Sequence, residues 1–417
     1  MKLLFKRYNY HFLLISIGIL WIAFLNYVLQ ISTQKFQFPD TLSYLIACEN
    51  LYKLQLVDAG RPTLILLIYG FPYLFGFSNW ALFPWSFVIN CISWFLIITL
   101  LFEILKSFVN QKKAFIFTLI YIFTVGSAVI NFHLLSETIF TLFLFASLYC
   151  FHKFHLSKRF GFLSFGICLL ILSVLIKPVS LLILIFILFF YAKLLYKNIK
   201  NSWSVLIFFS FMVLFFHLQL MKNQFGNYTI SYIDSFTYYN YLGTRADGLK
   251  TNAEFVQCDN ARFDYFTSLS LSEQKNEAFK DFKTQVIGNK WNLCKAYCID
   301  IYTNSFKGCQ AIYEYKNNNK TSYFEASKFF FRAVSLLQNA LFTIIGINLA
   351  VYFLLQRKKR NDVIVIASFI ILYIFLISGI SSEQGDRFHL VFYPEIIVLA
   401  AYFLKDKVSN LKMFKSQ

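Results

Sequence analysis

Residues 160–196 read FGFLSFGICLLILSVLIKPVSLLILIFILFFYAKLLY. The stretch carries only two charged side chains, Lys177 and Lys193, and it is long enough for two apolar helices of the roughly 20 residues that a bilayer requires. We place these helices at Phe160–Ile176 and Val179–Tyr196, which meet at Lys177 and Pro178. The pattern predicts two successive membrane-spanning helices.

The composition of the whole chain agrees with this local pattern. Hydrophobic residues make up 58% of the 417 residues and charged residues only 14%. A water-facing surface normally needs about a quarter of the residues to be charged. The net charge of +18 would fit nucleic-acid binding in a polar chain, but in so apolar a chain it indicates basic cytoplasmic loops, so we expect no nucleic-acid partner. The sequence predicts an all-α polytopic membrane protein.

Working outward from residues 160–196, we expect about ten membrane-spanning helices. They are His11–Ile31, Trp80–Phe102, Ala114–Asn131, Leu134–Phe151, Phe160–Ile176, Val179–Tyr196, Trp203–Met221, Arg332–Gln356, Val363–Ile380 and Leu390–Leu404. We therefore divide the chain into a transmembrane catalytic module at 1–221 with an outer loop at 32–79, an extracytoplasmic domain at 222–331, and C-terminal transmembrane helices at 332–417.

Lys and Arg residues gather in the loops on one side of this topology. The groups are Lys2/Lys6/Arg7, Lys106/Lys112/Lys113, Lys153/Lys158/Arg159, Lys193/Lys197/Lys200, Arg357–Arg360 and Lys405/Lys407/Lys412/Lys415. The short loops opposite hold far fewer. The positive-inside rule therefore predicts a multi-pass plasma-membrane protein with both termini in the cytoplasm.

Several segments outside the spans also read as helices. Thr41–Leu54 has apolar residues at helical spacing beside polar ones, which is typical of a helix lying in the membrane interface. A second helix is expected from Pro62 to Leu74. In the extracytoplasmic domain, capping-box spacing at Ser270 opens a helix to about Val286, and Asn289–Phe306 follows. The Tyr-rich stretch Tyr228–Tyr241 fits either a strand or a loop.

Four of the eight cysteines, Cys258, Cys294, Cys298 and Cys309, fall in the extracytoplasmic domain. An even number in an oxidising compartment indicates two disulfides, with zinc binding as the alternative. The least favoured of the pairings is Cys294 with Cys298, because i,i+4 positions on a helix give poor disulfide geometry.

Charged side chains next to spanning helices need a reason, because each is costly in the membrane. Apart from Glu103 and the basic groups on the inner side, those in this chain cluster at the outer ends of the helices rather than at the bilayer midplane, where a transporter of lipid-linked saccharides would place its binding site. This distribution favours a site at the outer lipid–water boundary.

Five short motifs share that outer side. They are Phe38–Leu45 (FPDTLSYL), Gly60–Pro62 (GRP), Leu135–Glu137 (LSE), Leu175–Pro178 (LIKP) and Gly385–His389 (GDRFH). In this order they resemble the GT-C glycosyltransferases, in the branch of the lipid A aminoarabinose transferases and protein O-mannosyltransferases. Two positions depart from that family: Arg is frequent where Lys177 stands, and Tyr where Phe388 stands.

The resemblance implies transfer of a sugar from a polyprenyl-phosphate donor to an acceptor hydroxyl, with inversion, on the extracytoplasmic side. The acceptor would be a glycan, a lipid or a protein. Asp40 matches the family's catalytic aspartate, although Asp is also a common N-cap for a helix such as the one starting at Thr41. Arg61, Lys177 and Arg387 are the cations available for the donor phosphate, with anchorage at the membrane surface as the alternative for each.

Glu137, His133, Asp386 and His389 are the further candidates for sugar or acceptor contact. A structural explanation also exists for Glu137, because an acid in the first turn of a helix is stabilised by the helix dipole, and for His133, which is a polar residue at a loop. Some members of the family use a divalent metal, for which Asp40, Glu137 and Glu49 are the acids at hand; the sequence leaves metal dependence open. The alternative functions are a polysaccharide polymerase or ligase, a flippase or transporter of lipid-linked saccharides, and a non-catalytic assembly or sensing protein.

Overall fold

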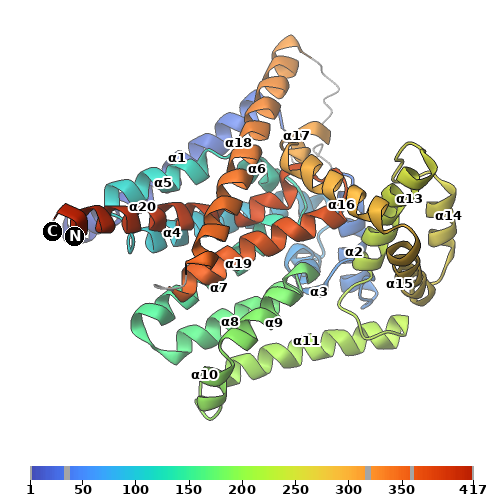
Figure 1. Ribbon diagram of the computed structural model, residues 1–417, viewed down its shortest axis with the longest axis horizontal. Helices are drawn as coiled ribbons and strands as arrows, with labels where there is room; N and C mark the ends of the chain where they lie inside the picture. The colour runs from blue at the N-terminus through green and yellow to red at the C-terminus, as the bar shows by residue number, and fades with distance from the viewer. Residues whose placement is uncertain (1, 32–37, 315–320, 357–360, 416–417) are drawn as a thin grey trace.

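The computed structural model describes residues 2–31, 38–314, 321–356 and 361–415, and all regular elements in these ranges are helical. The long helices form a bundle (Figure 1). They are α1 (Lys2–Val28), α4 (Leu82–Leu105), α5 (Gln111–Ile122), α7 (Glu137–Ser157), α8 (Phe160–Val174), α9 (Leu181–Phe190), α11 (Ser204–Phe225), α18 (Ser322–Leu355), α19 (Asp362–Ile377) and α20 (Tyr393–Lys415). The basic run 357–360, used above to orient the chain, lies outside the described residues.

The ten segments expected to span are all helical. Seven helices in the described residues are long and apolar enough to cross a membrane, and an eighth candidate is the bent pair Gln111–Ile122 and Val125–Phe132, with 67° between its halves. The fifth and sixth expected spans are the shorter apolar helices Phe160–Val174 and Pro178–Phe190. The expected all-α polytopic membrane fold is therefore confirmed, with fewer full-length spans than ten.

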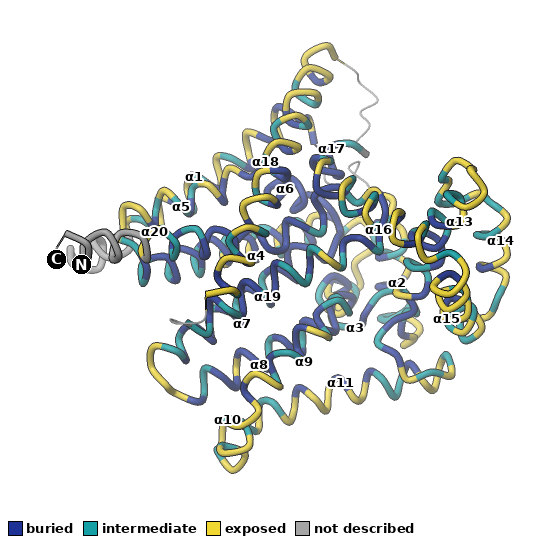
Figure 2. Tube along the Cα trace, viewed as in Figure 1, coloured by how far each residue is buried: buried dark blue, intermediate teal, exposed yellow. Residues whose placement is uncertain are grey.

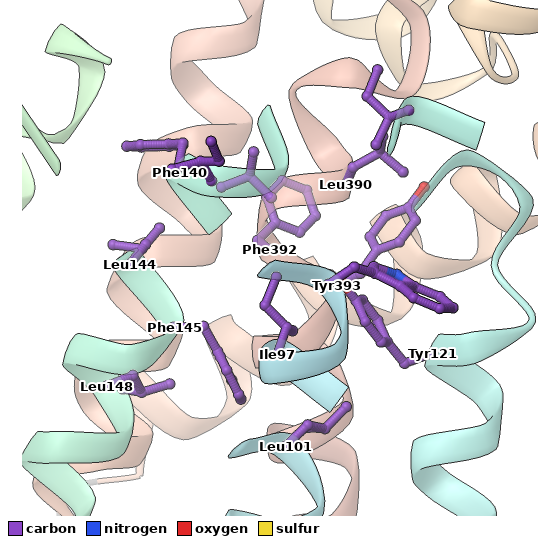
Figure 3. Close-up of a cluster of buried hydrophobic side chains, with 14 of the residues drawn as sticks. Ile97, Leu101, Tyr121, Phe140, Leu144, Phe145, Leu148, Leu390, Phe392 and Tyr393 are labelled. Atoms are coloured by element: carbon purple, nitrogen blue, oxygen red, sulfur yellow. The ribbon is translucent and has the colours of Figure 1, made fainter. Parts of the chain in front are cut away.

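The bundle is packed around α7. Phe140, Leu144, Phe145 and Leu148 of α7 are buried, and in Figure 3 they lie in one cluster with side chains from α4 and from the start of α20. Lipid is as apolar as these side chains, so close packing must hold the helices together in a membrane. Gly166 provides one such close approach, because a Cβ there would lie 2.7 Å from the ring of Phe151.

Large apolar side chains cover the outside of the bundle. On α11, Phe208 and Phe216 are 62% and 65% exposed, and α11 shows little of the buried colour in Figure 2. An apolar surface of this extent on a soluble protein would mark an interaction site. Around a bundle of apolar helices it is the surface that faces lipid.

The first outer loop folds into short helices at one end of the bundle. α2 (Thr41–Lys53) matches the expected helix and buries Tyr44, Ala47 and Cys48. α3 (Thr63–Tyr69) begins one residue after Pro62, and the 3₁₀ helices η1 (Phe71–Phe75) and η2 (Asn79–Ala81) follow. The helix expected from Pro62 to Leu74 is thus broken at Gly70.

The segment expected to be extracytoplasmic contains α12 (Ile233–Thr237), η5 (Tyr238–Gly243), α13 (Thr244–Thr251), α14 (Ala261–Ser268), α15 (Leu271–Gly288), α16 (Lys290–Ser305) and α17 (Gln310–Glu314). The capping box at Ser270 and Glu273 is present, and the two helices expected after it are α15 and α16. The Tyr-rich stretch is a loop followed by α12 and the π-helix η5, not a strand. In Figure 1, α13, α14 and α15 lie at the opposite end of the molecule from the start of α1 and the end of α20.

The expected disulfides are not present. All eight cysteines, each of them in the described part of the chain, are free thiols. Cys309 is fully buried, whereas Cys294 and Cys298 are exposed on α16. The number of cysteines in the extracytoplasmic segment could not reveal that some of these thiols are buried and others exposed.

Candidate active site

Five charged side chains from distant parts of the sequence meet at the end of the bundle where α7 begins. They are Asp40, Arg61, Glu137, Lys177 and Arg387, and we call them the ionic cluster. Each stands at the end of a helix: before α2, before α3, at the start of α7, after α8 and before α20. The cluster contains the expected catalytic acid, the three expected phosphate-binding cations and Glu137.

Asp40 links two arginines within the ionic cluster. Its Oδ1 accepts a hydrogen bond from Arg61 Nη2 at 3.1 Å, and its Oδ2 accepts one from Arg387 Nη2 at 3.0 Å. Asp40 occupies the N-cap position of α2, but its side chain caps no backbone N–H. The capping alternative therefore does not account for this carboxylate.

Asp40 is also the most accessible member of the cluster, with 31% of its side chain exposed against 2% for Glu137. Burial alone would raise the pKa of Asp40, but the charges of Arg387 and Arg61 outweigh it and lower the pKa below its ordinary value. Asp40 is thus an ionised carboxylate that an incoming molecule can reach.

Glu137 is the buried counter-charge of the ionic cluster. Its Oε1 accepts hydrogen bonds from Arg387 Nε at 3.1 Å, Arg387 Nη2 at 2.8 Å and Lys177 Nζ at 3.1 Å. A buried carboxylate without such partners would be strongly destabilising. The helix dipole at the start of α7 therefore adds to, but does not replace, the pairing with two cations.

The two arginines are held in fixed orientations. Arg387 also donates from Nη1 to Gln384 Oε1 at 3.0 Å and lies 4.4 Å from the ring centroid of Phe38. Arg61 donates to Ser43 Oγ through Nε at 3.0 Å and Nη2 at 2.8 Å, and lies 4.4 Å from the ring centroid of Tyr44. Ring stacking and several hydrogen bonds orient the planar guanidinium group, as anion recognition by arginine requires.

The charges of the ionic cluster do not cancel. Three cations, Arg61, Lys177 and Arg387, face two carboxylates, Asp40 and Glu137, so ionisation of all five leaves one positive charge in excess. A partly buried site with an excess cation favours an anionic ligand. A phosphate is the kind of anion that arginine forks bind in two-point contacts.

Asp386 and His389 lie behind the ionic cluster. The ring of His389 is fully buried, with Thr343 Oγ1 at 2.8 Å and Asn339 Oδ1 at 3.1 Å from its Nδ1. The Asp386 carboxylate packs against Gly126, where an added Cβ would overlap Oδ2. Within the described residues, no hydrogen bond or ion pair joins either side chain to the five cluster residues.

His133 is adjacent to the site but buried. Its ring meets the ring of Phe38 edge-on, with 5.7 Å between the centroids, and its carbonyl accepts a hydrogen bond from Asn90. Phe38 in turn lies against Arg387. His133 thus supports the wall of the site rather than the surface that a ligand would meet.

The side chains present do not fit a metal centre. The described part of the chain contains no group of three or more His, Cys, Asp or Glu residues placed to hold an ion. Glu49 is paired with Lys53 at 2.6 Å, and both carboxylates of the ionic cluster are occupied by cations.

Three residues at the site were not found from the sequence. Ser43 lies one turn after Asp40 on α2 and binds Arg61, and Gln384 stands three residues before Arg387 and binds it. These spacings were the only available signal. Tyr241 belongs to η5, and its pKa is raised to about 12 by burial and by the negative charge of Asp40. No sequence signal links Tyr241 to Asp40, because the fold alone brings them together.

Comparison with known proteins gives one structural likeness. No protein-family model and no curated protein matches the chain. The chain is similar in structure to ArnT from Cupriavidus metallidurans bound to undecaprenyl phosphate, with 10% sequence identity over 94% of this chain and 78% of that chain and a TM-score of 0.42. A likeness this distant does not assign an activity, so the function proposed below rests on the ionic cluster.

Proposed function

We propose that the protein is an integral-membrane glycosyltransferase of the GT-C type. It transfers a sugar from a polyprenyl-phosphate donor to an acceptor hydroxyl, with inversion, at the extracytoplasmic membrane surface. The observation that supports this most strongly is the position of Asp40, an accessible carboxylate held between two arginines in a cluster with excess positive charge.

The reaction needs a base that takes the acceptor proton and cations that stabilise the leaving phosphate. In the free protein the two are in contact, because Asp40 pairs with Arg61 and Arg387. The acceptor oxygen forms a bond to the anomeric carbon while the bond from that carbon to the phosphate oxygen breaks, and the phosphate leaves with the electron pair. Asp40 takes the hydroxyl proton, which is worth roughly 10²–10⁴ in rate. Arg387, Arg61 and Lys177 stabilise the charge that develops on the leaving phosphate. Attack opposite the leaving group inverts the anomeric centre.

Donor binding would also activate the base. A bound phosphate competes with Asp40 for the N–H groups of Arg61 and Arg387, which now bind the carboxylate at 3.1 and 3.0 Å. Because these cations hold the pKa of Asp40 low, their transfer to the phosphate raises that pKa. Asp40 thus becomes a stronger base when the donor is in place.

The placement of the cluster fits a lipid-linked donor. The start of α1 and the end of α20 lie at one end of the molecule, and α13, α14 and α15 lie at the other, as seen in Figure 1. Under the positive-inside rule the first end is cytoplasmic. The cluster would then lie at the outer surface of this membrane. The phosphate headgroup of a polyprenyl-phosphate donor lies at that surface while its isoprenoid chain stays in the bilayer.

The first experiment combines one substitution and its control with one binding measurement. Asp40→Asn should insert and fold normally but lose sugar transfer, whereas Asp247→Asn, which changes an exposed acid of α13, should keep it. Mass spectrometry of protein extracted with native lipids should find a bound polyprenyl phosphate. Retained transfer in Asp40→Asn would remove Asp40 from the mechanism. Movement of the lipid-linked sugar across the membrane without transfer would favour a flippase.

A further inference from the structure

The segment that carries Arg387 lies against the domain between α11 and α18. This segment, Ser378–Arg387, contains the 3₁₀ helices η6 (Ser378–Ile380) and η7 (Gly385–Arg387). The amide of Asn304, on α16, donates to the carbonyls of Ser378 at 2.8 Å and Ser381 at 2.7 Å. Oδ1 of Asn304 accepts a hydrogen bond from the backbone N–H of Gln384 at 2.8 Å. One fully buried amide therefore binds the segment at three points.

Gln384 continues this connection to the ionic cluster. Its backbone binds Asn304, and its side-chain Oε1 accepts from Arg387 Nη1 at 3.0 Å. Nη2 of Arg387 then binds both Asp40 and Glu137. An unbroken series of hydrogen bonds thus runs from α16 to Asp40.

The segment is also held in place by close packing against neighbouring residues. A Cβ at Gly379 would lie 2.5 Å from the ring of Tyr297, and a Cβ at Gly385 would lie 2.6 Å from the carbonyl oxygen of Gly308. Gly385 has a φ of +57°, which a residue with a side chain rarely adopts. The hydroxyl of Tyr297 also donates to the carbonyl of Leu376 at 2.7 Å.

We propose that Asn304 and Gln384 are positioning residues that orient the Arg387 guanidinium toward the donor phosphate, so that the domain between α11 and α18 sets donor affinity. The inference rests on the proposed function. Arginine binds phosphate through a rigid planar fork, and its contribution is lost when the fork is misdirected. Small displacements of such groups cost large factors in binding and rate.

The test measures the Kd of undecaprenyl phosphate for full-length protein in nanodiscs. Gln384→Leu removes the acceptor of Arg387 Nη1, and Asn304→Asp removes both donors to the segment. Gln384→Leu should weaken binding about tenfold, as expected for the loss of one hydrogen bond to a charged group. Asn304→Asp loses two hydrogen bonds to the segment and should weaken binding as well.

A matched control lies in the same domain. Gln285 is a buried amide whose Nε2 donates to the carbonyl of Gly243 at 3.0 Å, and among the described residues no hydrogen bond joins it to the segment that carries Arg387. Gln285→Leu should reduce the stability of the domain while leaving the Kd unchanged. An equal loss of affinity in Gln285→Leu would show that damage to the domain, not positioning of Arg387, weakens binding, and would overturn the proposal.

A double-mutant cycle shows whether the effect passes through Arg387. In an Arg387→Ala background, Gln384→Leu should cause no further loss of affinity, because the group that it orients is gone. A tenfold loss that persists in this background would overturn the inference, as would an unchanged Kd in Gln384→Leu alone. A wild-type protein that fails to bind undecaprenyl phosphate would overturn the proposed function and this inference together.

Discussion

At the scale of single residues, the ionic cluster combines two demands that conflict. Buried charges must be paired to be tolerated, yet a site for a phosphate must leave its cations available. Glu137, with 2% of its side chain exposed, satisfies the first demand by pairing with Lys177 and Arg387. Asp40, with 31% exposed, meets the second because a ligand can reach and replace it.

The pairing of Asp40 predicts a pH dependence. In the free protein its pKa is lowered, so the carboxylate stays ionised as the pH falls, and activity that depends on it is lost only when the pH falls through this lowered value. Arg61→Gln removes one of the two cations and should raise the pKa of Asp40. The acidic limb of a plot of kcat/KM against pH should then move to higher pH. An acidic limb that stays in place would show that Asp40 is not the titrating base.

Glu137 makes a prediction about stability. Glu137→Gln leaves Arg387 buried and Lys177 half-buried with only Asp40 as a counter-charge, and breaking a buried pair in this way costs about 3–5 kcal/mol. A thermal-unfolding measurement should show a clear drop in Tm. Removing one of the unpaired cations with Lys177→Met in the same protein should recover part of the loss. A double variant less stable than Glu137→Gln would contradict this account.

At the scale of helices, much of the fold could be predicted because spanning helices obey simple rules. Length and hydropathy located all ten apolar segments, and the spacing of Ser270 and Glu273 located α15. Local rules failed where tertiary contacts decide. The Tyr-rich stretch forms a π-helix over Tyr238–Gly243, and the four cysteines of its domain remain free thiols.

Helix packing in the bundle gives a prediction at Gly166. The ring of Phe151 on α7 occupies the space that a side chain at this position would need, with 2.7 Å to an added Cβ. Gly166→Val should force α8 away from α7 and destabilise the protein by about 1–3 kcal/mol, as overpacking usually does. Unfolding in detergent would measure the loss. Gly288→Ala, at a position with nothing within 4 Å, should not destabilise the protein.

At the scale of the whole molecule, the sequence indicated the five charged residues of the site but not the residues that hold them in position. The charged motifs at the outer ends of the helices included Asp40, Arg61, Glu137, Lys177 and Arg387, because charges beside spanning helices are costly and conspicuous. Asn304 and Gln384 carry no such signal, since an uncharged amide between helices looks like many others. Only the fold reveals that α16 holds the segment before α20.

The proposed topology predicts which thiols can be labelled from outside the cell. Cys294 and Cys298 are exposed on α16, which the positive-inside rule places outside. A membrane-impermeant maleimide added to intact cells, or to spheroplasts where an outer membrane is present, should label both without prior reduction, because both are free thiols. A cysteine introduced by Lys158→Cys, in a loop expected to be cytoplasmic, should react only after the membrane is permeabilised. Labelling of Lys158→Cys in sealed cells would show that the topology is inverted and that the ionic cluster lies at the cytoplasmic surface. Labelling of Cys294 and Cys298 only after reduction would show that these cysteines form disulfides.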